Sequence, residues 1–343
     1  MEKTFDRILA EIHNDPNSKA FILADAKDPD LAWGVSSTGL RLNGPGSQPG
    51  DKTKQEFYED IRTLVRQGVL DIMLTSISTM DRLGREERLF EDSPVTPAVR
   101  YNDTTDNWLA RGAHYNEIRS IPFASSSVKQ AVYGTLLPTK GQKPHVTLGL
   151  YSVTYNNNLE DDLRTLLAFK AFREEVEKEG VRYFLEVFDP NVKDCGIAPE
   201  ALPGFINDHI LRDLAGLPCA SQPLFLKIVY HGPAALEELV TSDSNLVVGV
   251  LGGGSGTTYD AFKLISEIQK YGARAATFGR KIKNAEFPPL FVEMLRHIVD
   301  GDLTAEQAVK AYHSGLYKLG IAPAHSLDQD EKLTASNLNY LAR

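Results

Sequence analysis

The chain has 343 residues, of which 42% are hydrophobic and 24% are charged, a composition typical of a soluble globular enzyme. Its net charge of −9 argues against a general nucleic-acid binder, although a local basic pocket can still hold an anionic metabolite. No apolar run approaches the roughly 20 residues of a membrane span, and the polar N-terminus lacks a signal peptide, so we expect a cytoplasmic protein. The two cysteines, Cys195 and Cys219, lack metal-ligand spacing, which argues against a disulfide framework or a structural metal site.

Strand-like and helical segments alternate along the chain. The predicted barrel strands are residues 20–24, 69–75, 98–102, 145–151, 183–188, 224–230, 246–251 and 275–278. Helical segments, such as residues 54–67, 159–179 and 259–271, lie between them. This alternation is typical of a parallel sheet covered by helices, and α/β barrels commonly reach this length as one domain. The predicted fold is therefore a single TIM (β/α)8 barrel spanning residues 1–343.

Three further segments are interpreted separately. Residues 4–15 have one apolar stripe, and we expect this amphipathic helix to close the bottom of the barrel. Residues 107–144 are harder to assign: we predict a helix at 108–119 and an additional strand at 131–137. The polar tail, residues 320–343, is expected to be loosely held or to take part in oligomer contacts.

Charged residues follow or interrupt the early strands. Asp25, Lys27 and Asp28 come at the end of the first strand, and Arg100 lies on the third. Because chemistry in these barrels is carried by the C-terminal ends of the strands, we expect these side chains to point toward the site, where they could contact a substrate. The alternatives are that the aspartates cap a helix and that Arg100 has a structural role.

Two later strands, otherwise apolar, each contain one charged residue: Glu186 in the fifth and Lys227 in the sixth. Both would point into the barrel lumen if the registers of the two strands correspond. Burial disfavours an ammonium group and favours the neutral amine, which is the form that attacks a ketone or aldehyde to make a Schiff base. The alternative is that Lys227 pairs with a carboxylate or extends from a strand end to solvent. A buried glutamate beside a buried lysine can stabilise both, and we favour a functional role for Glu186.

The last two strands end in features typical of phosphate sites. The seventh runs into Gly-Gly-Gly-Ser-Gly just before a helix, and the eighth ends in Gly279 and Arg280. The backbone N–H groups of Gly253, Gly254 and Ser255 can approach an anion near the positive end of that helix. Arg280 adds a forked donor for phosphate oxygens. In a barrel of eight βα units the loops after strands seven and eight commonly bind phosphate, whereas a glycine run alone would indicate only a flexible turn.

The segments LFLKIVYHG, GGGSGTT and FGRKI resemble the last three βα units of the class I, Schiff-base-forming aldolases. The group is that of the archaeal-type fructose-bisphosphate, tagatose-bisphosphate and deoxyribose-phosphate aldolases. The similarity is good over residues 181–314, fair over 20–77 and poor between them. The resemblance implies that Lys227, on the sixth strand, forms the Schiff base, and that the turns after strands seven and eight bind phosphate.

The resemblance also implies proton-transfer roles. The strand-five glutamate of tagatose-bisphosphate aldolases, which serves as acid and base, matches Glu186. An acidic residue at the end of strand one matches Asp25, with Asp28 as the second choice. Archaeal-type members carry a catalytic tyrosine on a nearby strand, for which Tyr151 and Tyr155 are the candidates. Tagatose-type members have a second lysine on the fourth strand that this chain lacks.

We therefore expect a class I aldolase that cleaves or forms a phosphorylated ketose through Lys227, without a metal or other cofactor. Its ligand would be a small phosphorylated sugar, and the protein would be a homo-oligomer. Glu186, helped by Tyr151 or Asp25, would move protons. Two alternatives are open: a transaldolase-like synthase that uses the same lysine, and a non-catalytic or isomerase-like phosphate-binding barrel in which Lys227 only neutralises an anion.

Overall fold

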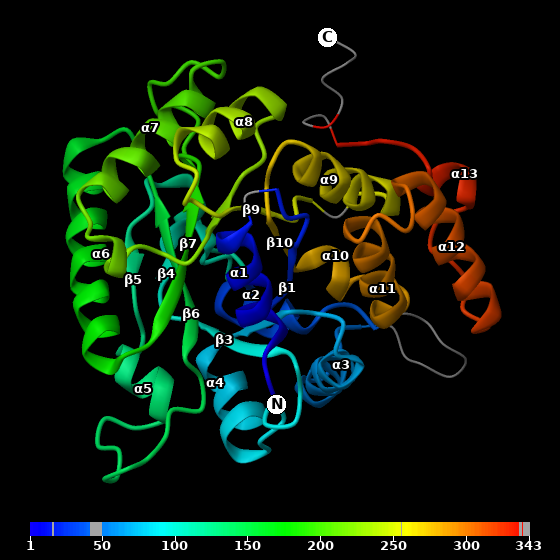
Figure 1. Ribbon diagram of the computed structural model, residues 1–343, viewed down its shortest axis with the longest axis horizontal. Coiled ribbons are helices and arrows are strands. Elements are labelled where there is room, and N and C mark those ends of the chain that lie inside the picture. Colours follow the sequence, from blue (N-terminus) through cyan, green and yellow to red (C-terminus); the bar gives the residue numbers. More distant parts are fainter. Residues whose placement is uncertain (16, 42–49, 255, 336–337, 339–343) are drawn as a thin grey trace.

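The computed structural model describes residues 1–15, 17–41, 50–254, 256–335 and 338. Within them, eight parallel strands close into a barrel in the order β1-β10-β9-β8-β7-β6-β3-β2 (Figure 1). These strands are β1 (Ile22–Lys27), β2 (Ile72–Thr75), β3 (Thr96–Arg100), β6 (Leu148–Thr154), β7 (Arg182–Phe188), β8 (Leu226–Ile228), β9 (Val248–Leu251) and β10 (Ala275–Phe278). Neighbouring strands follow one another in chain order around the barrel, as in a TIM barrel. The predicted fold class is confirmed.

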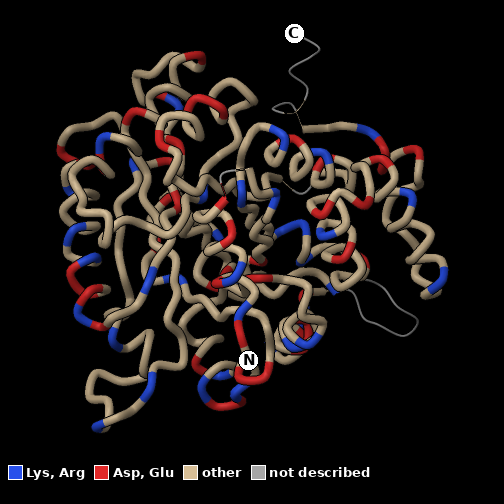
Figure 2. Tube along the Cα trace, viewed as in Figure 1, with Lys and Arg blue, Asp and Glu red and all other residues tan. Residues whose placement is uncertain are grey.

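Helices cover the outside of the barrel (Figure 1). The longer ones are α3 (Lys54–Gln67), α6 (Leu159–Glu179), α7 (Leu202–Ala215), α8 (Pro233–Ser242), α9 (Thr258–Lys270), α11 (Pro288–Val299) and α12 (Ala305–Lys318). A capping box of Thr53 and Glu56 begins α3, and Gly68, with a φ of 72° in the left-handed region that favours glycine, ends it. Acidic and basic residues are interspersed along the outer helices (Figure 2). No described helix is long and apolar enough to cross a membrane.

Alternation along the strands divides the buried residues into two cores. The lumen core holds alternate residues of the barrel strands: Ile22, Ala24, Ile72, Leu74, Ala98, Leu148, Leu150, Phe184, Phe225, Val247 and Ala275. The helix α1 (Thr4–Asn14) packs Phe5, Ile8 and Leu9 against this core. The intervening residues of each strand, such as Leu23 on β1, pack outward against the helices. A side chain therefore points into the lumen only if it has the same parity as the lumen core, that is, if it lies an even number of positions from a lumen-core residue of the same strand.

The segment between β3 and β6 differs from the prediction in two places. No helix spans residues 108–119; the structure has β4 (Asp103–Thr104), β5 (Pro122–Phe123) and short 3-10 turns instead. The strand predicted at 131–137 is wrong, because residues 128–133 form the helix α5 (Val128–Tyr133). Its start is a capping box of Ser127 and Gln130, a signal that the sequence already contained.

The described part of the C-terminal tail packs against the barrel helices. His313 Nε2 on α12 lies 2.9 Å from Asp330 Oδ2 on α13 (Leu327–Asp330). Further on, the backbone N–H of Thr334 donates to Asp260 Oδ1 over 2.7 Å. Asp260 also accepts from the N–H of Thr257 at the start of α9. The tail up to residue 335 is therefore joined to the helix that follows the glycine-rich turn.

Candidate active site

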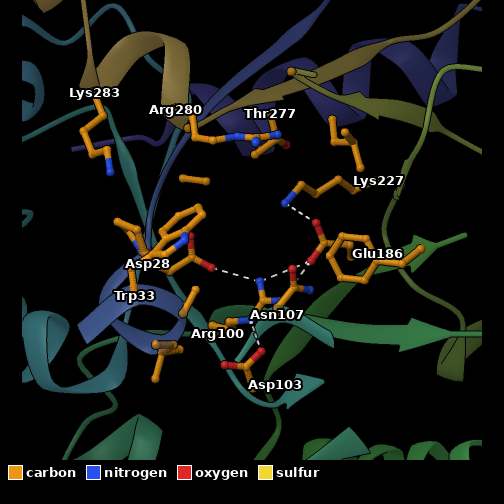
Figure 3. Close-up of a pocket in the computed structure, with 18 of the residues that line it drawn as sticks. Asp28, Trp33, Arg100, Asp103, Asn107, Glu186, Lys227, Thr277, Arg280 and Lys283 are labelled. Carbon is orange, nitrogen blue, oxygen red and sulfur yellow. Dashed lines mark hydrogen bonds and ion pairs between the residues drawn. The ribbon is translucent and has the colours of Figure 1, made fainter. Parts of the chain in front are cut away.

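A cavity of about 240 Å³ opens at the C-terminal ends of the barrel strands. Its walls come from six of the strands and the loops that follow them, with β8 and β7 contributing Lys227 and Glu186 (Figure 3). The short helices α2 (Asp30–Trp33) and α10 (Arg280–Lys283) cover one side. This end of a TIM barrel is where active sites are found.

Lys227 and Glu186 lie side by side inside this cavity. Their Cα atoms are register partners on β8 and β7, and each comes two residues after a phenylalanine of the lumen core, Phe225 and Phe184. Lys227 is 6% exposed and Glu186 is 2% exposed. The Lys227 Nζ forms an ion pair with Glu186 Oε1. The structure therefore brings together the lysine and the carboxylate that the sequence singled out.

The other oxygen of Glu186 is held by two further residues. Ser152 Oγ donates to Glu186 Oε2 over 2.7 Å, and both terminal nitrogens of Arg100 lie 3.2 Å from it. Burial alone would raise the pKa of Glu186, but the charges of Lys227 and Arg100 outweigh it and lower the pKa below its ordinary value of 4.5. The carboxylate is therefore ionised and fixed in orientation at neutral pH.

Arg100 is shared among three carboxylates. Besides Glu186, it contacts Asp28 Oδ2 at 2.9 Å and Asp103 Oδ1 at 3.8 Å. Burial raises the pKa of Asp103 to about 6, against the lowering effect of the Arg100 charge. We refer to Asp28, Asp103 and Glu186 as the carboxylate cluster. Its negative charge compensates that of Arg100.

On another edge of the cavity are two basic residues, Arg280 and Lys283 (Figure 3). Arg280 Nη2 donates to the backbone O of Gly253 over 3.0 Å, and Lys283 Nζ to Ser37 O over 3.1 Å. Neither forms an ion pair with a carboxylate of the described residues. Burial, with the nearby charges of Lys27 and Arg280, lowers the pKa of Lys283 to about 8. We call Arg280 and Lys283 the cation pair, and its uncompensated charge suits an anion.

Packing and backbone conformation favour glycine at the turn beside the cation pair. Gly252, Gly253 and Gly279 line the cavity. A side chain at Gly252 would meet the Phe278 ring at 2.5 Å, and Gly253 has a φ of 65°, which favours glycine. Gly254 lines a separate hollow behind the turn, between it and the C-terminal segment. Ser255, the remaining residue of the predicted phosphate turn, lies outside the described residues.

Asp25 and Lys27 do not enter the cavity, contrary to the expectation. They alternate with the lumen residues of β1 and are buried on its outer face, where Lys27 Nζ lies 3.2 Å from Asp25 Oδ2. Burial raises the pKa of Asp25 to about 6 despite the Lys27 charge. The acidic residue of strand one that lines the cavity is Asp28.

The candidate tyrosines also lie outside the barrel wall. Tyr151 stacks on Phe172 with a ring-centroid distance of 4.2 Å, within the core between the strands and the helices. The hydroxyl of Tyr155 donates to Asp213. The residue of β6 that reaches Glu186 is Ser152, one position from Tyr151 and on the lumen side. The expected placement of Tyr151 at the site is therefore not found.

Several residues that line the cavity or contact Glu186 were missed in the sequence. Ser152 has the lumen parity of Leu148 and Leu150, and Lys283 follows Arg280 by one helical turn. These two could have been found once the strand register and the helix were known. Trp33 and Asp103 belong to the short elements α2 and β4, which no periodic pattern places at the cavity.

Comparisons with known proteins give no match by sequence and several by structure. No family model and no curated protein matches the chain. An archaeal fructose 1,6-bisphosphate aldolase is 14% identical and has a TM-score of 0.59, with 86% of this chain and 99% of that chain covered. Fructose-bisphosphate aldolase from Slackia heliotrinireducens is 13% identical, has a TM-score of 0.62 and aligns over 90% of this chain and 89% of its own.

A third structure is an archaeal fructose-1,6-bisphosphate aldolase whose catalytic lysine is covalently bound to the carbinolamine intermediate of the substrate. It is 14% identical, has a TM-score of 0.59, and covers 86% of this chain and all of its own. At such identities the likeness concerns the fold. In its fold, then, this chain is similar to the archaeal-type, Schiff-base-forming fructose-bisphosphate aldolases, as the resemblance in its last three βα units indicated.

Proposed function

We propose that the chain is a class I aldolase whose Lys227 forms a Schiff base with a phosphorylated ketose. The proposal rests on one observation above all: the amine of Lys227 contacts a buried carboxylate inside a cavity that also contains an uncompensated cation pair. A solved structure of the same fold, described as having its catalytic lysine bound to a carbinolamine, supports it. The proposed steps use protein side chains and call for no metal or added cofactor.

Schiff-base formation would begin with the contact between Lys227 and Glu186. Proton transfer from Nζ to the carboxylate gives the neutral amine and a carboxylic acid. The amine adds to the carbonyl carbon while the acid donates its proton to the carbonyl oxygen, giving a carbinolamine. Glu186 then takes a proton from the nitrogen and passes it to the hydroxyl group, which leaves as water. The protonated imine and the ionised carboxylate remain.

Cleavage would use the protonated imine as an electron sink. Glu186 takes the proton from the hydroxyl group on the carbon β to the imine carbon, the C–C bond breaks, and its electron pair forms the enamine. The aldehyde fragment leaves. Glu186 returns the proton to the enamine carbon, and hydrolysis of the imine releases the ketone and Lys227. Ser152 and Arg100 hold the other oxygen of Glu186 and so keep the carboxylate aligned throughout.

The cation pair would bind the phosphate of the ketone-derived fragment. Arg280 and Lys283 supply charge, and Gly252 and Gly253 allow close approach of the backbone. Because the turn after β9 follows the strand next to β8, and α10 follows β10 on the far side of β9, the phosphate would anchor the substrate on this side of Lys227. Binding energy from this remote group then positions the reacting carbonyl.

Borohydride trapping tests the proposal. The protein is incubated with dihydroxyacetone phosphate, reduced and digested, and the peptides are analysed by mass spectrometry. We expect an adduct on Lys227 and none on Lys281, which lies outside the cavity and donates to the backbone O of Gly256. If a panel of phosphoketoses gives no adduct, the phosphate-binding barrel without Schiff-base chemistry is the better account. A transaldolase-like synthase would give the same adduct and would differ only in passing the enamine to a second aldehyde.

A further inference from the structure

We infer that the ketose carries a single phosphate, on its ketone-derived fragment, and that the aldehyde fragment it releases is uncharged. This inference rests on the proposed function and deepens it by naming the class of substrate. It separates the chain from the fructose-bisphosphate aldolases of similar fold, whose named substrate carries two phosphates.

The arrangement of the strands fixes the direction in which a substrate lies. Lys227 on β8 has β9 and β10 on one side and β7, β6 and β3 on the other. The cation pair follows β10, and Arg280 donates a hydrogen bond to the backbone O of Gly253, in the turn after β9. Glu186, which would take the proton from the departing hydroxyl, is on β7. The aldehyde fragment therefore lies on the side of β7, β6 and β3, away from the cation pair.

The charges at the cavity are sufficient for one phosphate. Four basic residues line it, and two of them are already compensated: Lys227 by Glu186, and Arg100 by the carboxylate cluster. Among the described lining residues, Arg280 and Lys283 are left to face an incoming anion. A phosphate monoester carries a charge of about −1.5 to −2 at neutral pH, so the cation pair matches a single one.

The aldehyde side of the cavity would repel a second phosphate. Figure 3 shows Asp103 and Arg100 across the cavity from Arg280 and Lys283. All three members of the carboxylate cluster contact the one guanidinium there. A phosphate near Arg100 would meet these carboxylates as well, and like charges brought together at a binding site discriminate strongly against the wrong ligand.

Neutral groups complete that side. Asn107 and Leu109 line the cavity, and the amide of Asn107 donates to Thr104 Oγ1, next to Asp103 of the cluster, over 3.2 Å. The ring of Trp33 lies instead beside the cation pair, with its centroid 5.3 Å from Lys283 Nζ. The carboxylates and the amide of Asn107 can bond hydroxyl groups, and the leucine surface suits carbon-bound hydrogens. A short hydroxylated aldehyde without a phosphate fits this combination of groups.

The decisive experiment measures condensation of dihydroxyacetone phosphate with either D-glyceraldehyde or D-glyceraldehyde 3-phosphate. We expect kcat/KM for the uncharged aldehyde to be at least about tenfold higher, because the phosphorylated one faces the carboxylate cluster. Replacing one member of the cluster, Asp103→Asn, should reduce this preference several-fold. Equal rates, or a preference for the phosphorylated aldehyde, would overturn the inference.

A binding measurement makes the test independent of turnover. Mannitol 1-phosphate and mannitol 1,6-bisphosphate have no carbonyl group, and their Kd values can be compared by calorimetry. We expect the second phosphate to leave binding unchanged or to weaken it, and Arg280→Ala to weaken both ligands by a similar factor. Binding of the bisphosphate about tenfold tighter, a gain that a charge-assisted phosphate contact would supply, refutes the inference.

The two proposals fail in different ways. An adduct of dihydroxyacetone phosphate on Lys227, together with a preference for the phosphorylated aldehyde, would leave the aldolase proposal standing and remove only the single-phosphate inference. Absence of any adduct would remove both.

Discussion

The substitution Glu186→Gln tests the chemistry most directly. The change keeps the shape of the side chain but removes its charge and replaces one acceptor oxygen with a donor NH2 group. In the structure the two oxygens accept contacts from Lys227, Arg100 and Ser152, so at least one of these donors would lose its acceptor. The amide also cannot take a proton, which removes the acid and base of the proposed mechanism.

The magnitudes follow from these losses. Removal of a positioned acid and base lowers kcat by about 10²- to 10⁴-fold. Breaking a buried ion pair by removing one partner costs about 3 kcal/mol of the free energy of unfolding. KM for a phosphorylated ketose should change little, because the cation pair is untouched. The imine on Lys227 should still form, although more slowly, and borohydride reduction should still trap it as an adduct.

The assay compares kcat and KM for ketose cleavage with the free energy of unfolding from urea titration. The matched control is Ser152→Ala, which removes a 2.7 Å hydrogen bond to the same carboxylate but no charge. It should cost about 1.5 kcal/mol of stability and leave most of the activity. A Glu186→Gln variant that cleaves ketose as fast as the wild type would refute the proton-transfer role, whatever its stability.

Three further predictions concern the other charged and aromatic residues. Lys283→Met should raise KM for phosphorylated substrates about tenfold, whereas Lys281→Met should not. Because the pKa of Lys283 is lowered to about 8, the amine loses its charge as the pH passes 8, and the wild-type KM should rise there. The rise in KM should be absent in the Lys283→Met variant. If it persists in that variant, Lys283 is not the phosphate-binding group that titrates. Lys27→Met removes the charge that keeps the pKa of Asp25 from rising above about 6, so the pKa of Asp25 should rise further in this variant. A carboxyl group with a raised pKa in the folded state lowers the free energy of unfolding as the pH rises. The variant should therefore lose more unfolding free energy, relative to wild type, at pH 8 than at pH 5, and a larger loss at pH 5 would contradict the buried pairing. Tyr151→Phe should keep kcat within about twofold, because the Tyr151 side chain packs in the core outside the barrel wall, away from Lys227 and Glu186. A hundredfold loss of kcat would return Tyr151 to the mechanism.

Much of the barrel could be predicted because its signals are local. The helix at residues 54–67 has a capping box and a glycine stop within its own sequence, and the last three strands are short apolar runs with glycine at their ends. The helix α5 had an equally local signal in Ser127 and Gln130, but the β-branched and aromatic residues after it favoured a strand. The strand predicted at residues 131–137 was therefore wrong, although the capping box of Ser127 and Gln130 indicated a helix.

The position of Asp25 shows why parity could not be decided in advance. Residues 20–24 are apolar at every position, so neither face of the strand is marked as the lumen. The barrel selects Ile22 and Ala24 for the lumen because these residues pack against α1 and the neighbouring strands, and Asp25 then faces outward. The same ambiguity applied to Tyr151 on β6, whose strand is buried at all seven positions.

The sequence by itself determined the alternation of strands and helices, and it marked Lys227 and Glu186, because a single charge in an apolar strand stands out whatever surrounds it. Tertiary structure decided which charges compensate one another. Closure of the barrel brings Arg100 and Ser152 to Glu186 from separate strands, and brings Asp28 to Arg100. Such contacts depend on the register between strands, which no local pattern encodes. That closure also leaves Arg280 and Lys283 facing the cavity without an ion pair to a carboxylate of the described residues, and we propose that this uncompensated charge binds the phosphate.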